Sequence, residues 1–138
     1  MQTIVPMLSY EDVAAAVDWL TNAFGFRESG ERFAGADGRV AHAELSSGDG
    51  VVMLGWPGPH YRGPRRLAEL SEDARQMLDN PYVVDGVLVH VDDIESHLER
   101  ARAAGAEILR GIDDEPFGRL YTAADPEGHR WMFVEPTS

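Results

Sequence analysis

The sequence contains no cysteine, no lysine and no long apolar segment. Without cysteine, the chain cannot form disulfide bonds, thiolate nucleophiles or cysteine-ligated zinc sites. Because all 12 basic residues are arginine, a lysine Schiff base is excluded as well. No apolar run approaches the roughly 20 residues of a membrane span, and the opening MQTIVPMLSYED lacks the basic and apolar parts of a signal peptide. We therefore expect a cytoplasmic protein with no membrane partner.

Acidic residues outnumber basic residues by 24 to 12, which gives a formal net charge of −12. A surface of this sign repels phosphate backbones, so nucleic acid is not expected as a partner. The charge favours a cationic or neutral ligand, and it also serves solubility.

The first 56 residues follow the pattern of one strand, one helix and three further strands. IVPMLS alternates like a strand, and a helix follows from Asp12. Ser9 or Glu11 is its expected N-cap, and Gly25 follows its last turn. Its apolar residues keep the three- and four-residue spacing of an amphipathic helix: Val13, Ala16, Val17, Leu20 and Phe24. FRESGERF, RVAHAEL and VVMLGW predict the three strands.

Residues 83–138 repeat this order. GVLVHV predicts a strand, a helix begins at Asp92-Asp93, and AEILRGI, GRLYTAA and HRWMFVE predict three more strands. Asp-Pro-Glu-Gly at 125–128 predicts a tight hairpin turn before the last strand. Glycines recur 80 or 78 residues apart: Gly25 and Gly105, Gly38 and Gly118, and Gly50 and Gly128. We interpret the chain as a single domain of two βαβββ modules, residues 1–56 and 83–138.

Residues 57–82 connect the modules, contain four prolines and predict a short helix over 67–78. A connection this long is either a lid over a functional site or a tether. Each module leaves one sheet face bare, so the predicted α+β fold pairs two sheets into a cupped half-barrel with a ligand cavity on its concave side. The modules can pair within one chain or between chains, and we expect a homodimer.

Several stretches resemble the vicinal oxygen chelate superfamily, which includes glyoxalase I, extradiol dioxygenases, fosfomycin-modifying enzymes and bleomycin resistance proteins. They are the opening LSYEDVAAAVDWLTNAFGF, the HVDD before the second long helix, and the closing DPEGHRWMFVEP. The resemblance covers nearly the whole chain except residues 57–82. GRVAHAEL and AFGFRE are most similar to the glyoxalase/bleomycin-resistance-like proteins. The resemblance predicts the fold more narrowly than the function, because one scaffold carries many chemistries.

Enzymes of this superfamily hold a divalent metal ion with His, Glu or Gln from the first and last strands of each module. Carried over by the resemblance, the first-strand positions fall on Val5 and Gly86. The last-strand positions fall on Met132 and on either Met53 or Leu54. None of these residues offers the oxygen or imidazole donors that such cations require. We therefore expect no metal site and no cofactor.

Other residues are candidates for binding a ligand, and none is assigned a catalytic role: His42, Glu44, Trp56, His60, Tyr61, His90, Arg119 and Tyr121. His42 and Glu44 are two apart in a predicted strand and therefore share a face. His90 shares a face with Gly86 and Leu88. As pocket residues, the histidines are candidates for donating or accepting protons; the alternative for each is a packing role.

The remaining candidates lie on loops or at repeated positions. Trp56, His60 and Tyr61 lie at or near the start of the connecting segment, which suits the edge of a pocket. Arg39 and Arg119 follow the repeated glycines Gly38 and Gly118. Each arginine either forms bidentate hydrogen bonds with carboxylates of the protein or binds the ligand. His97 is predicted on the solvent side of its helix, and His129 in a turn. Trp131 and Phe133 alternate with Met132 and are predicted in the core.

These features favour a metal-independent small-molecule binding protein of the glyoxalase/bleomycin-resistance type. The resemblance and the acidic charge extend this prediction to sequestration of a cationic or aromatic antibiotic. The alternative is a lyase, isomerase or dioxygenase of the same superfamily that acts on a small organic substrate, with or without a divalent metal. A metal-free enzyme would use His42, Glu44 or His90 as acid–base residues.

Overall fold

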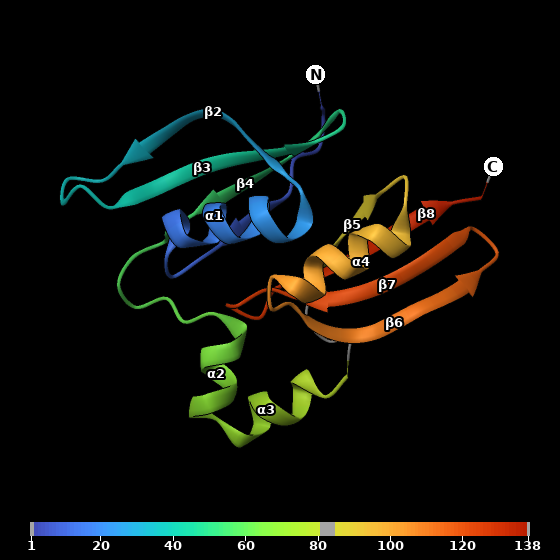
Figure 1. Cartoon of the computed structure of the whole chain (residues 1–138). Coiled ribbons are helices and arrows are strands. Elements are labelled where there is room, and N and C mark those ends of the chain that lie inside the picture. Colours follow the sequence, from blue (N-terminus) through green and yellow to red (C-terminus); the bar gives the residue numbers. More distant parts are fainter. Residues whose placement is uncertain (1, 81–84, 138) are drawn as a thin grey trace. The chain divides into compact units, whose positions relative to one another are not determined.

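The computed structural model describes residues 2–80 and 85–137. Contacts divide the chain into two compact units, Met1–Gly63 and Pro64–Ser138. Each unit contains one four-stranded sheet and one long helix (Figure 1). This arrangement confirms the α+β class and the two βαβββ modules. None of the helices in the described ranges is long and apolar enough to cross a membrane.

The first unit holds module one. Its elements are β1 (Met7–Ser9), α1 (Val13–Phe24), β2 (Arg27–Ala34), β3 (Val40–Ser47) and β4 (Gly50–Gly55). The strand order is β1-β4-β3-β2, with β1 parallel to β4 and the other pairs antiparallel. The first and last strands of the module therefore lie side by side, while α1 connects β1 to β2 at the far edge of the sheet.

The second unit repeats this topology after two short helices. Its elements are α2 (Pro64–Leu70), α3 (Glu72–Leu78), β5 (Gly86–His90), α4 (Ile94–Ala103), β6 (Glu107–Glu115), β7 (Gly118–Ala124) and β8 (Arg130–Pro136). The strand order is β5-β8-β7-β6. The predicted single helix over 67–78 is wrong: Ser71 ends one helix and caps the next by accepting a hydrogen bond from the Ala74 amide.

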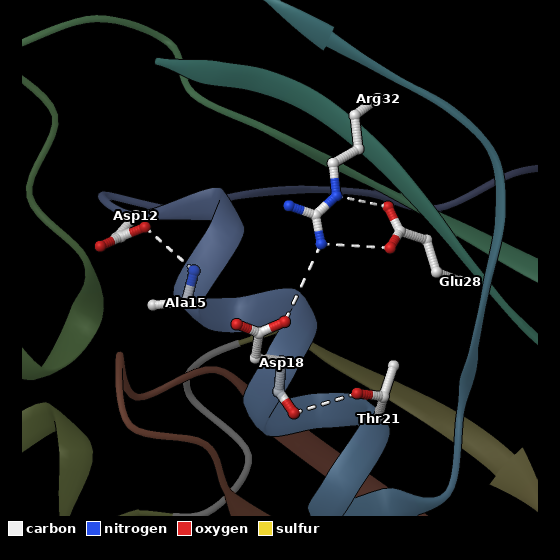
Figure 2. Close-up of polar contacts among 6 residues, drawn as sticks. All are labelled: Asp12, Ala15, Asp18, Thr21, Glu28 and Arg32. Carbon is white, nitrogen blue, oxygen red and sulfur yellow. Dashed lines mark hydrogen bonds and ion pairs between the residues drawn. The ribbon is translucent and has the colours of Figure 1, made fainter. Parts of the chain in front are cut away.

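Both long helices start in the same way. The Asp12 side chain accepts a hydrogen bond from the Ala15 amide at 3.0 Å (Figure 2), and Asp93 accepts one from the Ser96 amide at 3.2 Å. The N-cap of α1 is therefore Asp12 and neither Ser9 nor Glu11, because only the residue next to the first turn reaches its free amides. Gly25 ends α1 in the left-handed region, with φ of 76°, as predicted.

The edge strand β2 is tied to α1 by an arginine (Figure 2). Arg32 donates two hydrogen bonds to the Glu28 carboxylate, at 2.7 and 3.1 Å, and lies 3.9 Å from Asp18 of α1. This contact places Arg32 and Glu28 on the α1 side of the sheet. Ser29, the neighbour of Glu28, points to the other face, where it pairs with Glu44.

The predicted turn at 125–128 is confirmed and is anchored in the core. Asp125 is fully buried and accepts hydrogen bonds from the amides of Glu127 and His129 and from the indole of Trp131. The Gly128 amide closes the turn on the Asp125 carbonyl at 2.9 Å. One carboxylate therefore fixes both the turn and the start of β8.

Candidate functional site

One face of the first sheet packs on α1, and the other, which we name the distal face of module one, points away from it. Ala43, Leu45 and Leu54 are at most 1% exposed and form the α1 side. Because neighbouring strand residues point to opposite faces, His42 and Glu44 lie together on the distal face, as their spacing predicts.

Strand register arranges the distal face of module one in two rows that cross all four strands. The Glu44 row contains Ser29 on β2, Glu44 on β3, Met53 on β4 and Met7 on β1. The His42 row contains Phe33, His42, Gly55 and Ser9 on the same strands. Neighbours within a row are close enough to touch a common ligand.

The polar groups of these rows are only partly engaged. The Ser29 hydroxyl donates to Glu44 Oε2 at 3.2 Å, and no hydrogen bond within residues 2–80 and 85–137 reaches Oε1. The His42 ring lies 5.8 Å from the Phe33 ring, and its nitrogens bond to none of the described residues. Both His42 and Glu44 are half-buried. Glu44 Oε1 and the His42 ring nitrogens therefore have no hydrogen-bond partner among residues 2–80 and 85–137.

The distal face of module two is defined by the residues that contact α4. His97 of α4 contacts Tyr121 and Phe133, so the alternate residues of β7 and β8 face away. Two rows correspond to those of module one. The first contains Leu88, Met132, Thr122 and Arg110, and the second contains His90, Val134, Leu120 and Asp113.

These module-two rows are chemically different from their counterparts. Leu120, Thr122 and Val134 are at most 5% exposed. Arg110 is held by Asp113 and Glu115, each at 3.0 Å. His90 is exposed and shares this face with Leu88, as predicted. The buried positions of module two therefore lie where module one has the part-exposed His42 and Glu44.

The positions that superfamily enzymes use for metal ligands carry no donor set suited to a hard divalent ion. Register places Met53 on the distal face of module one, because its neighbour Leu54 is buried on the α1 side. This decides between the two residues that the sequence left open. Gly86 and Met132 lie on the distal face of module two. Within the described parts of the chain, no three His, Asp or Glu side chains gather as a group that could hold a metal.

The structure moves two predicted binding residues away from the distal faces. Tyr121 is fully buried, and its hydroxyl lies 2.5 Å from His97 Nδ1, which places its ring on the α4 side of the sheet; its role as a ligand contact stays a prediction. Arg119 points toward α4 and pairs with Glu95 at 3.0 Å and Asp114 at 3.4 Å. His97 is also not on the solvent side as predicted, because its ring stacks 4.2 Å from Phe133.

Arg39 and Arg119 are not equivalent in the fold, although both follow a repeated glycine. When the two modules are superimposed by strand pairing, Leu54 corresponds to Phe133, and their partners Ala43 and Tyr121 also correspond. Strands β3 and β7 are therefore offset by 78 residues (121 minus 43), whereas the repeated glycines before Arg39 and Arg119 are offset by 80. Arg39 lies outside β3, and its guanidinium carbon is 4.5 Å from the centroid of the Trp56 ring. One face of Trp56 is thus covered by a cation.

The connecting segment is fixed at several points. The Tyr61 hydroxyl donates to the Ser9 carbonyl at 2.9 Å, and the Gly63 amide donates to Glu11 at 3.0 Å, while His60 is exposed. In the second unit, Arg130 donates to the carbonyls of Leu78 and Asn80. Whether the segment is a lid or a tether stays open, and residues 81 and 82 lie outside the described residues.

Sequence reasoning missed two residues of the His42 row, Phe33 and Gly55. Phe33 follows a register irregularity in β2 between Ser29 and Phe33, which breaks the two-residue alternation. Gly55 carries no side chain and is visible as a site feature only once its neighbours across the sheet are known. A glycine inside an apolar strand was the only available signal.

Comparison with known proteins agrees with this architecture. The sequence model of the Glyoxalase/Bleomycin resistance protein/Dioxygenase superfamily matches residues 4–133. The uncharacterized protein Mb0911c of Mycobacterium bovis is 31% identical over 132 residues, covering 95% of this chain and 81% of that protein.

Solved structures show the same fold. TioX from Micromonospora sp. ML1 is 35% identical, with a TM-score of 0.69 and coverage of 99% of this chain and 98% of that one. A bleomycin-binding protein from Streptomyces verticillus, solved with copper(II)-bleomycin, is 18% identical with a TM-score of 0.62, covering 99% and 98%. The chain belongs to the Glyoxalase/Bleomycin resistance protein/Dioxygenase superfamily.

Proposed function

We propose that this protein binds a small organic molecule without a metal ion and serves to sequester it. The observation that carries the proposal is the chemistry of the metal-ligand positions. Where superfamily enzymes place carboxylates, amides and imidazoles, this chain has Val5, Met53, Gly86 and Met132. Two of these side chains are thioethers, which serve mainly soft metal ions, and the other two donate nothing.

Apolar and aromatic groups on the distal faces support a binding role. Met53 and Met132 are flexible, polarizable side chains that adapt to the shape of an organic ligand. His42 and Glu44 add polar groups whose bonds are not committed within the described residues. His90 on module two, and Trp56, His60 and Tyr61 near the connecting segment, complete the proposed contacts.

The comparisons support an antibiotic as the kind of ligand. The Streptomyces verticillus protein that shares this fold is named for bleomycin binding. The net charge of −12 favours a cationic molecule of this kind. Sequestration requires affinity alone, which agrees with the lack of oxygen and imidazole donors at Val5, Met53, Gly86 and Met132.

The proposal is tested by titrating EDTA-treated protein with copper-free bleomycin while tryptophan fluorescence is followed. We expect saturable quenching with EDTA present throughout, so that neither the protein nor bleomycin carries a metal ion. A cationic aromatic compound without chelating groups that binds only after Mn²⁺ or Zn²⁺ is added would contradict metal independence. No response to bleomycin or to any other cationic aromatic compound would contradict the binding role.

The pair His42 and Glu44 favours one second candidate function, metal-free proton transfer in a lyase or isomerase. The two functions differ in what becomes of the bound compound. A sequestering protein returns it unchanged after prolonged incubation, whereas an enzyme converts it. Mass spectrometry of the recovered compound, with His42→Ala as the control protein, distinguishes them.

A further inference from the structure

The His42 row on the distal face of module one has a gap at Gly55. Register places this glycine between His42 on β3 and Ser9 on β1. A Cβ atom built at Gly55 would meet only the Ala41 carbonyl oxygen, at 3.8 Å, which is ordinary van der Waals contact. Gly55 is not among the glycines with positive φ. Neither the backbone nor the packing therefore requires a glycine at this position.

The His42 ring borders this gap, and the Phe33 ring follows His42 in the same row, one strand further from Gly55. Phe33 is 58% exposed, although it lies in a strand next to His42. The two ring centroids are 5.8 Å apart and the planes are inclined by 46°. Two neighbouring rings that continue the row from an empty position offer a surface to a flat ligand, because aromatic rings gain from ring–ring contacts beyond simple burial.

A carboxylate lies within reach of the same gap. Glu44 is two residues from His42 on one strand, which is about 6.5 Å at the usual rise per residue. Ser29 holds Oε2 and leaves Oε1 unbonded among the described residues. Arg27 lies in the next row over, but it is exposed and forms no ion pair within residues 2–80 and 85–137. Glu44 Oε1 can therefore accept a hydrogen bond from a ligand.

We infer that Gly55, His42, Phe33 and Glu44 form a subsite for a flat, positively charged ring, such as an aromatic amidine or a protonated nitrogen heterocycle. The ring lies over Gly55 beside the two aromatic side chains, and its positive group donates to Glu44 Oε1. This inference rests on the proposed function, because it takes the distal face as the ligand surface. It adds the chemical class of the group that is recognised.

Four small probes separate shape from charge: benzamidine, benzamide, cyclohexanecarboxamidine and benzoate. Benzamidine is flat and cationic, and each of the others lacks one of these properties. We expect NMR titration to show benzamidine binding in the millimolar range or tighter, as is usual for a fragment of this size. The other three probes should bind at least about tenfold more weakly, because each loses ring contact or a charge-assisted bond.

Variants of the two central residues make the test specific. Gly55→Val fills the gap and should weaken benzamidine at least about tenfold; Gly55→Ala adds one methyl group and should give an intermediate loss. Gly111→Val is the matched control, because a Cβ atom at Gly111 of β6 has no neighbour within 4 Å. Glu44→Gln should abolish the preference for benzamidine over benzamide and leave benzamide unchanged.

Three results would overturn the subsite: unchanged benzamidine affinity in both Gly55 variants, a retained cation preference in Glu44→Gln, or equal affinity for all four probes. If bleomycin binds the wild type while benzamidine does not, the subsite fails and the proposed function stands. If neither binds, both fail. Melting temperatures of all variants, measured alongside, show whether a loss of binding accompanies a loss of fold.

Discussion

The two modules have the same topology and place different chemistry on the same positions. On the distal face, His42, Glu44 and Gly55 of module one correspond by register to Leu120, Thr122 and Val134 of module two. The first set is half-buried, and Ser29 is the one described residue that forms a hydrogen bond with its side chains, whereas the second set is at most 5% exposed. The comparison teaches that the same positions of the duplicated sheet hold part-exposed polar groups in one module and buried, mostly apolar side chains in the other.

The helix-facing sides differ in a complementary way. Module two packs His97, Tyr121 and Phe133 together under α4, with ring centroids 4.2 to 5.8 Å apart. The corresponding positions of module one hold the smaller Ala16, Ala43 and Leu54. Module one instead places its aromatic contacts at the end of α1, where Phe24 meets both Trp19 and Phe26 edge-on.

The largest expected difference between the modules is in the second distal-face row. Leu120→Ala should lower the free energy of unfolding by about 3 kcal/mol, because it opens a cavity at a residue that is 2% exposed. His42→Ala, at the corresponding position, should change it by less than about 0.5 kcal/mol. Urea denaturation measures both. If His42→Ala lowered the free energy of unfolding as much as Leu120→Ala does, the two positions would not differ in their contribution to the core.

The second-largest difference in stability is expected between the hairpin turns of the two modules. Asp125→Ala should cost about 2 kcal/mol or more, because it leaves the buried Trp131 indole and two amides without their acceptor. Asp49→Ala, in the exposed turn of module one, should lie within about 0.5 kcal/mol of wild type. Thermal unfolding of the two variants compares them. Equal losses would show that the module-one turn has an anchor of its own.

A smaller effect is expected in the aromatic cluster under α4. Tyr121→Phe retains the ring and removes the hydroxyl that contacts His97, so we expect a loss of about 1 kcal/mol. Ala43→Ser is the comparison in module one, where no partner for a hydroxyl corresponds to His97. Chemical denaturation of both variants gives the values. An unchanged free energy of unfolding in Tyr121→Phe would show that the hydrogen bond of the hydroxyl contributes no net stability.

The smallest effect on stability is expected from the ionisation of the same tyrosine, and it appears only at alkaline pH. Burial raises the pKa of the Tyr121 phenol above its usual value near 10. The folded state therefore favours the neutral phenol. Its contribution to the free energy of unfolding is complete below about pH 10 and is lost as the pH rises further. Wild type should lose more stability than Tyr121→Phe between about pH 9 and 11. Urea denaturation across this pH range measures both proteins. Equal losses of stability in wild type and Tyr121→Phe would contradict the raised pKa of Tyr121.

Most of the framework follows from local patterns in the sequence. The helix register, the left-handed Gly25 and the turn at 125–128 depend on neighbours along the chain, and all three were predicted. His42 and Glu44 share a face because strand residues alternate, which also needs no distant contact. Trp131 and Phe133, predicted in the core, are fully buried.

The errors came from contacts across the sheet. Strand β7 is buried on both faces, so its sequence does not show which side Tyr121 occupies. The glycine repeat placed Arg39 opposite Arg119, whereas strand register differs from it by two residues. Phe33 and Gly55 join His42 only through pairing between strands. A ligand face assembled from several strands needs this register, which a single sequence does not supply.

The most direct test of the central claim is a two-dimensional ¹H–¹⁵N NMR titration of EDTA-treated protein with copper-free bleomycin. With the metal absent throughout, saturable shifts should be largest at the amides of His42, Glu44 and Gly55, and smaller at the module-two counterparts Leu120, Thr122 and Val134. The opposite pattern, or an absence of shifts until a divalent metal ion is added, would contradict the account.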